Sequence, residues 1–328
     1  MNRKRGGFWL GLVGAICVSI GAAIAEPPTP QAPMRAIWVW NTSELLASEG
    51  QRELFLRSLF ADGFTDVFLY LRAHDYQTQE HPLKRFLASL QRSGVRVFGM
   101  EGWRGYFSDV EGPAGLYAAA DAMLAFNRRS DARFAGFHSD LEPHDGQGEG
   151  RTRFHNGIAQ SKLTARQLAD RDDLMSEWLS IHAALRERMR AASLVYSAAV
   201  PGWLDDYEGE AVTMPAGEGR QGVMGRLMAL VQDYVVMSYN TDPANVLRRI
   251  EGELAHAEKL GPAAPRILFA LETHRGPGLR VSYGDTPMKA SRSAVRADFE
   301  TISRAAARYR SFAGGAIHDW KGWRDLPE

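Results

Sequence analysis

Short apolar segments rich in Val, Ile, Phe and Tyr recur along the chain. They lie at residues 35–40, 66–71, 95–100, 134–141, 194–200, 234–239, 267–271 and 315–318. Continuous apolar runs of this length are typical of strands that are buried on both faces of a sheet. The pattern therefore predicts eight buried β-strands.

Longer segments with helical spacing of their apolar residues separate these runs. They lie at residues 44–61, 82–93, 114–129, 165–192, 244–260 and 293–310. Strands that alternate with helices form a parallel sheet. A doubly wound open sheet usually has a glycine-rich phosphate turn after its first strand, whereas Trp-Val-Trp-Asn-Thr stands at residues 38–42 here. We therefore predict an α/β fold, a single (β/α)8 TIM barrel.

The longest polar segments all follow predicted strands, at residues 103–113, 143–163, 203–222 and 273–292. Segments that precede strands, such as residues 92–94 and 261–266, are short. In a (β/α)8 barrel the loops after the strands build the active-site face. We therefore expect long loops and the functional site on the C-terminal face.

The first 25 residues carry a different pattern, with a basic patch at residues 2–5, an apolar stretch at residues 8–25 and a small-x-small ending at residues 23–25. This order is typical of a secretory signal. An uncleaved anchor is the alternative, because the stretch approaches the ~20 residues of a spanning helix. We predict a signal peptide at 1–25, a Pro-rich linker at 26–33, a barrel domain at 34–328, and a periplasmic or secreted protein without stable membrane insertion once the signal is cleaved.

Charge and cysteine content narrow the function classes. Lys and Arg number 39 and Asp and Glu number 39, so the chain has no net field to attract a polyanion and nucleic acid is not an expected partner. The single cysteine, Cys17, lies inside the predicted signal. The mature chain would then have no disulfide, no Cys-ligated zinc and no thiol nucleophile. We expect no cofactor and no metal.

The end of the fourth predicted strand has the strongest candidate chemistry. A strand period of two places His138, Asp140 and Glu142 on one face. Two carboxyl groups this close can couple, so that one is held as an acid while the other stays charged. A purely structural pair, bonded to loop N–H groups and Arg side chains, is the alternative.

These residues resemble the D-x-x-D-x-D-x-E signature of the chitinase-like family 18 glycoside hydrolases. Asp140 and Glu142 match its last two positions, whereas its first two fall on Ala135 and His138. Residues 237–240, Met-Ser-Tyr-Asn, are similar to the family's M-x-Y-D element, and Trp320 follows the eighth strand where the family has an aromatic platform. The resemblance extends in order over the whole barrel.

The resemblance implies a glycosidase acting on a polysaccharide with N-acetylated sugars. Glu142 would protonate the leaving oxygen, Asp140 would orient the acetamido group and Tyr239 would bond the ring intermediate. The substrate itself would supply the nucleophile, which departs from the usual two-carboxylate pattern.

Other readings remain open. Glu272 ends the seventh strand and could be the nucleophile of a retaining glycosidase that keeps Glu142 as the acid. A metal-dependent deacetylase is also conceivable, although no H-x-H or H-E-x-x-H spacing occurs. Its candidate ligands are His138, Asp140, Glu142 and His144 at alternate positions and His74, His274, His318 and Asp319 at the ends of other strands. A barrel that binds a glycan without cutting it is the non-catalytic alternative.

Aromatic and polar residues at strand ends are the candidate sugar contacts. Tryptophan can stack on the apolar face of a sugar and offer its N–H to a hydroxyl. The predicted substrate-binding residues are Trp40, Trp103, Trp203, Trp320, Arg72, Glu101, Asp205, His138 and Asn240. A carbohydrate is therefore the expected partner.

Overall fold

The computed structural model describes residues 33–328, except residues 108–111 and 145–152. The predicted signal peptide, residues 1–25, and residues 26–32 of the predicted linker lie outside the described residues. Within the described part, no helix is long and apolar enough to cross a membrane.

Eight parallel strands within residues 33–328 close into a barrel, which confirms the predicted fold class. They are β1 (Met34–Val39), β2 (Asp66–Tyr70), β3 (Arg96–Glu101), β4 (Gly136–Asp140), β5 (Val195–Pro201), β8 (Asp233–Met237), β9 (Arg266–Glu272) and β10 (Phe312–His318). Each overlaps one of the predicted strands. The barrel closes where the first and last strands pair, with Ile37 opposite Ile317.

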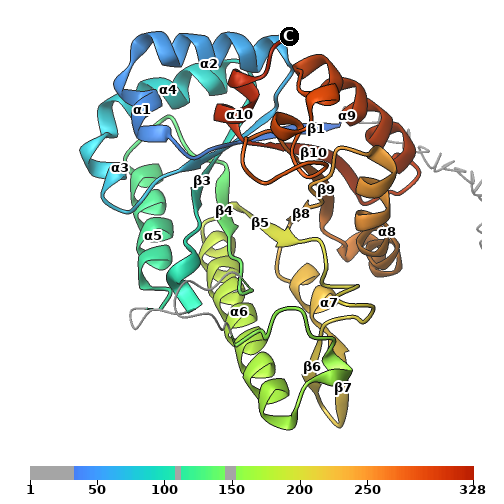
Figure 1. The fold of residues 1–328 in the computed structure, drawn as a ribbon. Coiled ribbons are helices and arrows are strands. Elements are labelled where there is room, and N and C mark those ends of the chain that lie inside the picture. Colours follow the sequence, from blue (N-terminus) through green and yellow to red (C-terminus); the bar gives the residue numbers. More distant parts are fainter. Residues whose placement is uncertain (1–32, 108–111, 145–152) are drawn as a thin grey trace, which may run out of the picture. The chain divides into compact units, whose positions relative to one another are not determined.

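Helices surround the barrel (Figure 1). They are α1 (Thr42–Ala47), α2 (Glu49–Ala61), α3 (Asp75–Thr78), α4 (Glu80–Arg92), α5 (Ala114–Arg128), α6 (Ala165–Ala191), α7 (Val223–Met228), α8 (Pro243–Leu260), α9 (Arg292–Ala306) and α10 (Trp320–Asp325). Short 3-10 helices lie at Arg104–Phe107, Gln160–Lys162, Gly261–Ala263, Tyr283–Asp285 and Pro287–Lys289.

Side-chain caps set where several helices begin. The predicted helix at 44–61 is two helices, because the Ser48 hydroxyl accepts a hydrogen bond from the Gln51 backbone N–H and starts α2. Thr164 and Gln167 form a reciprocal capping box at the start of α6. Asp242 caps α8, which has a proline at its first position.

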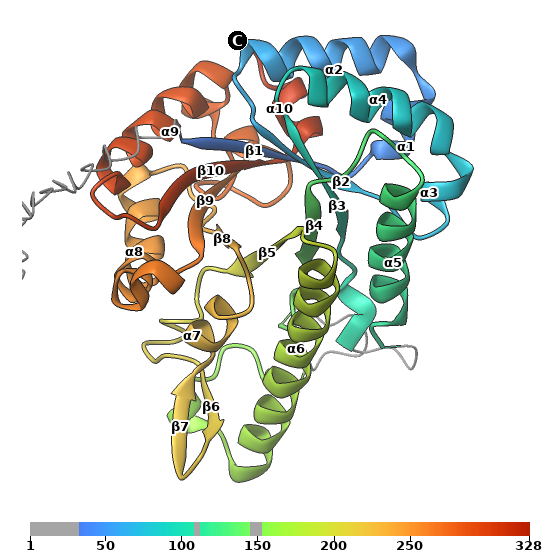
Figure 2. The same ribbon diagram turned by 180° about the vertical axis from the view of Figure 1, so that it is seen from behind.

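The loop after β5 contains an element that the sequence pattern did not predict, the antiparallel hairpin of β6 (Thr213–Ala216) and β7 (Gly219–Gly222). The hairpin stands beside the N-terminal part of α6, away from the barrel strands (Figures 1 and 2). It is part of the 203–222 segment, one of the long loops expected on the C-terminal face.

Alternating strand residues divide the core into two layers. The side chains inside the barrel are those of Met34, Ala36, Trp38, Phe68, Phe98, Met100, Ala199, Val235, Leu268, Ala270 and Ala316. The residues between them, such as Val67, Phe137 and Phe269, face the helices. This alternation decides which residue at each strand end points into the mouth of the barrel.

Candidate active site

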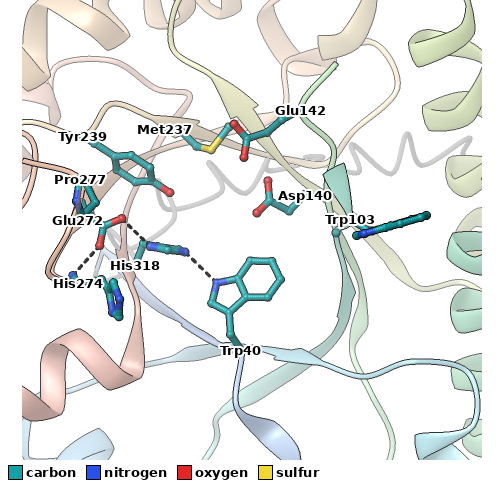
Figure 3. Close-up of a pocket in the computed structure, with 11 residues that line it drawn as sticks. Trp40, Trp103, Asp140, Glu142, Met237, Tyr239, Glu272, His274, Pro277 and His318 are labelled. Atoms are coloured by element: carbon teal, nitrogen blue, oxygen red, sulfur yellow. Dashed lines mark hydrogen bonds and ion pairs between the residues drawn. The ribbon is translucent and has the colours of Figure 1, made fainter. Parts of the chain in front are cut away.

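A cavity of about 580 Å³ opens at the C-terminal ends of the barrel strands (Figure 3). The residues that line it are Trp40, Gly102, Trp103, Asp140, Glu142, Met237, Tyr239, Glu272, His274, Pro277 and His318. All four predicted catalytic residues, Asp140, Glu142, Tyr239 and Glu272, are therefore brought together in one pocket. A pocket of this size with a few convergent polar groups is the usual form of a ligand site.

The acid pair lies at the end of β4. Asp140 is the last residue of the strand, and Glu142 follows at the next inward position. The Glu142 Oε2 atom lies 3.5 Å from the Nε2 atom of His144. The His144 ring in turn contacts the Trp203 ring, with centroids 4.9 Å apart in an edge geometry. Glu142, the candidate acid, is thus connected through His144 to Trp203 in the loop that follows β5.

Tyr239 faces the pair across the pocket (Figure 3). Burial raises the pKa of its hydroxyl well above the usual value, and the negative charges of Glu272, Asp140 and Glu142 add to the shift. The hydroxyl therefore keeps its proton throughout the physiological range. It can donate a hydrogen bond to an oxygen or nitrogen atom that enters the pocket.

A hydrogen-bonded chain crosses the other side of the pocket. The Trp40 indole N–H donates to His318 Nε2 over 2.8 Å, and His318 Nδ1 lies 2.7 Å from Glu272 Oε2. The other Glu272 oxygen accepts the backbone N–H of His274 over 2.6 Å. Both carboxylate oxygens of Glu272 are thus engaged by the protein.

No protein-family model and no curated protein matches the sequence of the chain. Solved structures match its fold. The spore cortex-lytic enzyme SleL of Bacillus megaterium QM B1551 is 12% identical, with 92% of this chain and 73% of that chain covered and a TM-score of 0.51. A chitinase from Chromobacterium violaceum ATCC 12472 is 13% identical, with 90% and 96% covered and a TM-score of 0.49. A GH18 chitinase from Pseudoalteromonas aurantia is 12% identical, with 87% and 93% covered and a TM-score of 0.46.

The match to SleL shows a shared fold and no more. The (β/α)8 barrel that the resemblance implied is confirmed by the closed eight-stranded sheet within residues 33–328. Of the family-like positions, Asp140, Glu142, Met237 and Tyr239 all line the pocket.

His138 lies on the inner face of the barrel, as expected, but it is fully buried below Asp140. Its ring stacks on Phe68 at a centroid distance of 3.8 Å, Nε2 accepts the Trp38 indole N–H, and Nδ1 lies 2.8 Å from the Ser197 hydroxyl. Burial lowers the pKa of His138 to about 3, so the ring is neutral. His138 is a core residue and does not reach the pocket.

Two of the four predicted tryptophans also lie elsewhere. Trp320 is buried at the start of α10, where its ring packs edge-on against Phe55. Trp203 is half-buried among loop aromatic rings and does not line the pocket. Trp40 and Trp103 do line it, and Trp103 is 46% exposed at the rim.

The polar candidates outside the pocket each have another role. Because Met100 faces the barrel interior, its neighbour Glu101 faces the helices, where burial raises its pKa to about 7 and the Tyr106 hydroxyl bonds it. Asp205 packs against Gly252 of α8, in a region where a side chain on that glycine would collide with the carboxylate. Arg72 is exposed and lies 3.6 Å from Asp75.

Asn240 turns toward the start of α8, and its side-chain oxygen accepts the Asp242 backbone N–H over 2.9 Å. Pro277 and Gly102 line the pocket without a predicted role, whereas His274 and His318, which also line it, were expected only as conceivable metal ligands. His318 ends the eighth predicted strand, so its position was the available signal. The hydrogen bond between His318 and Trp40 could not be predicted from the sequence, because the two residues are 278 positions apart.

Among the described residues, no group of three or more His, Cys, Asp or Glu side chains could hold a metal ion. The deacetylase alternative therefore gains no support from a described ligand cluster.

Proposed function

We propose that this protein is an exported glycoside hydrolase that cleaves a polysaccharide containing N-acetylated sugars. The observation that carries the proposal is the convergence of Asp140, Glu142 and Tyr239 in one pocket at the C-terminal face of the barrel. This is the face on which (β/α)8 enzymes carry their active sites. Trp40 and Trp103 add the flat apolar surfaces that a sugar ring requires.

In the proposed reaction, Glu142 transfers its proton to the glycosidic oxygen as the bond from that oxygen to the anomeric carbon breaks. The acetamido carbonyl oxygen of the substrate forms the new bond to the anomeric carbon. Asp140 accepts the acetamido N–H, which aligns the carbonyl for attack, and the Tyr239 hydroxyl donates to the cyclic intermediate. Water then opens this intermediate and gives its proton to Glu142, which restores the acid.

The contacts of Glu272 favour this mechanism over direct attack by Glu272. One of its oxygens holds the His274 backbone N–H and the other holds His318. A nucleophile needs an oxygen aimed at the anomeric carbon, so Glu272 would have to leave one of these partners.

The departures from the family pattern support the non-catalytic alternative. Ala135 has no ionisable group, and His138 is neutral and buried, so neither supplies the charge of the aspartate that the family has at that position. A barrel with this pocket, in which no neighbouring aspartate adjusts the pKa values of Asp140 and Glu142, would bind a glycan without cutting it.

Replacement of Glu142 by Gln separates the two functions. If the protein is a hydrolase, wild type releases reducing ends from chitooligosaccharides, and Glu142→Gln lowers kcat by about 100-fold or more while binding persists. Glu53→Gln, on the exposed surface of α2, is the matched control and should keep wild-type turnover. Wild type that binds chitooligosaccharides but cleaves none of a broad glycan panel is a binding protein, and equal turnover by Glu142→Gln rules out the assigned acid.

The export that we propose is supported by the pattern of residues 2–25 alone. N-terminal sequencing of the protein recovered from its native host should begin near Glu26. Recovery of an intact N-terminus in a membrane fraction would support the anchor alternative.

A further inference from the structure

Three neighbouring strands supply the chain of hydrogen bonds beside the acid pair. Trp40 directly follows β1, His318 ends β10 and Glu272 ends β9, and β10 pairs with both other strands. The contacts run from Trp40 to His318 over 2.8 Å and from His318 to Glu272 over 2.7 Å (Figure 3). Glu272 is nearly fully buried, so this series of hydrogen bonds is anchored in the barrel wall.

The chemistry of the groups assigns the protons in this chain. An indole nitrogen can only donate, so His318 Nε2 must carry the lone pair that accepts the Trp40 N–H. His318 Nδ1 then carries the single ring proton and donates it to the Glu272 carboxylate. The neutral ring with its proton on Nδ1 is thus the form that completes the chain.

The series of hydrogen bonds ends at Trp40, the aromatic ring that is best placed to receive a sugar. Trp40 lines the pocket, and its ring packs beside Tyr70 with centroids 5.4 Å apart. Trp320, where the family resemblance places the aromatic platform, is buried against Phe55 instead. Trp103 lies at the exposed rim, so Trp40 is the tryptophan inside the pocket.

We propose that Glu272 and His318 are positioning residues that hold the Trp40 indole as the sugar-stacking floor of the pocket. This inference rests on the proposed carbohydrate function and deepens it, because it assigns specificity for a pyranose ring to the first strand. It also assigns Glu272 to substrate binding instead of nucleophilic attack. Fixing a ring before the ligand arrives lowers the ordering cost of binding.

The charges around His318 make this arrangement sensitive to pH. Glu272 on β9, Asp140 on β4 and Asp319 next in the chain face it, as does the Tyr239 ring after β8. Burial lowers the pKa of His318, but these carboxylates outweigh burial and leave the pKa raised. A second proton would occupy Nε2 and remove the acceptor of the Trp40 N–H. The Trp40 indole therefore keeps its hydrogen bond to His318 at pH values above the pKa of His318, and it loses this bond as the pH falls through that pKa.

Two substitutions break the same contact from opposite sides. Trp40→Phe keeps an aromatic ring but loses the N–H donor. His318→Asn keeps a donor near the Nδ1 position for Glu272 but cannot reach Trp40, so no buried charge is left unpaired. Each change should weaken chitooligosaccharide binding about 2- to 10-fold, as loss of one hydrogen bond does. Binding is measured by calorimetry in the Glu142→Gln protein, which prevents turnover.

The double variant decides whether His318 acts through Trp40. If it does, the double variant binds no more weakly than either single variant, since both remove one interaction. The matched control is Trp103→Phe, whose effect should add to that of His318→Asn. Additive losses for Trp40→Phe and His318→Asn, or no loss in either, would overturn the positioning role. Failure of the Glu142→Gln protein to bind any glycan overturns the proposed function and this inference with it.

A spectroscopic measurement tests the contact without a ligand. The indole N–H resonance of Trp40 should move as His318 takes up its second proton, and the movement should vanish in His318→Asn. An indole resonance with the same pH dependence in both proteins contradicts the proposed contact.

Discussion

A buried histidine outside the pocket leads to a quantitative prediction about acid stability. His182 of α6 is fully buried, and its Nδ1 atom lies 2.6 Å from the Tyr196 hydroxyl. Its Nε2 atom is buried without a hydrogen-bond partner among the described residues. Burial lowers the pKa of His182 to about 3. The folded protein therefore keeps this ring neutral under conditions in which an exposed histidine takes up a proton.

The sign and size of the effect follow from proton linkage. Between pH 6.5 and pH 3 the unfolded chain binds one more proton at this site than the folded protein, so stability falls as the pH falls. The free energy of unfolding should fall by about 2 kcal/mol between pH 7 and pH 5. In this range His182 takes up a proton in the unfolded chain, with a pKa of about 6.5, but not in the folded protein, where its pKa lies well below 5. His138 has the same shift and should contribute a similar loss.

Replacement of His182 by Phe removes the titrating group and leaves Tyr196 its other hydrogen-bond partner, Ser139. Urea unfolding at pH 7 and pH 5 should show that the variant loses about 2 kcal/mol less than wild type on acidification. His81→Gln, at an exposed site on α4, is the control and should lose as much as wild type. Equal losses in wild type and His182→Phe would refute the reasoning.

Two further substitutions test how the end of β4 is held. Gly102→Ala would place a Cβ atom 2.6 Å from the Asp140 carbonyl oxygen and 2.7 Å from its Cβ atom, so turnover should fall while circular dichroism stays native; unchanged turnover would mean that Asp140 tolerates the shift. Trp178→Phe removes the N–H that bonds the Leu141 carbonyl over 3.1 Å, and urea unfolding should show a loss of about 1–3 kcal/mol, whereas an unchanged midpoint would mean that the carbonyl finds another donor.

Sequence periodicity predicted the barrel well because each strand buries a continuous apolar run. The same period of two placed Asp140 and Glu142 together on the inner face. It misplaced Glu101, because the predicted third strand ends at residue 100, whereas β3 extends to Glu101, whose side chain faces the helices. Inward and outward positions are one residue apart, so a strand end must be placed exactly to one residue before its side chain can be assigned.

Contacts between distant segments could not be predicted in this way. Trp320 follows a strand, but α10 is only six residues long and has too few turns for a helical period to show. Its packing against Phe55 depends on how α10 meets α2. Similarly, the neutral state of His138 depends on Phe68 and Trp38, which come from two other strands.

One side of the pocket lies where β1 and β10 pair to close the barrel, so the pocket is complete only when the barrel has closed. Trp40 directly follows β1 and His318 ends β10, the first and last strands of the barrel in the sequence. These two strands can pair only when the chain includes β10. A chain that stops before β10 would still contain Asp140, Glu142 and Tyr239, yet nothing would fix the indole beside them. Ligand binding should therefore appear late in refolding, together with the final closure of the sheet, because contacts between such distant segments form slowly. Binding in this pocket should therefore depend on completion of the barrel.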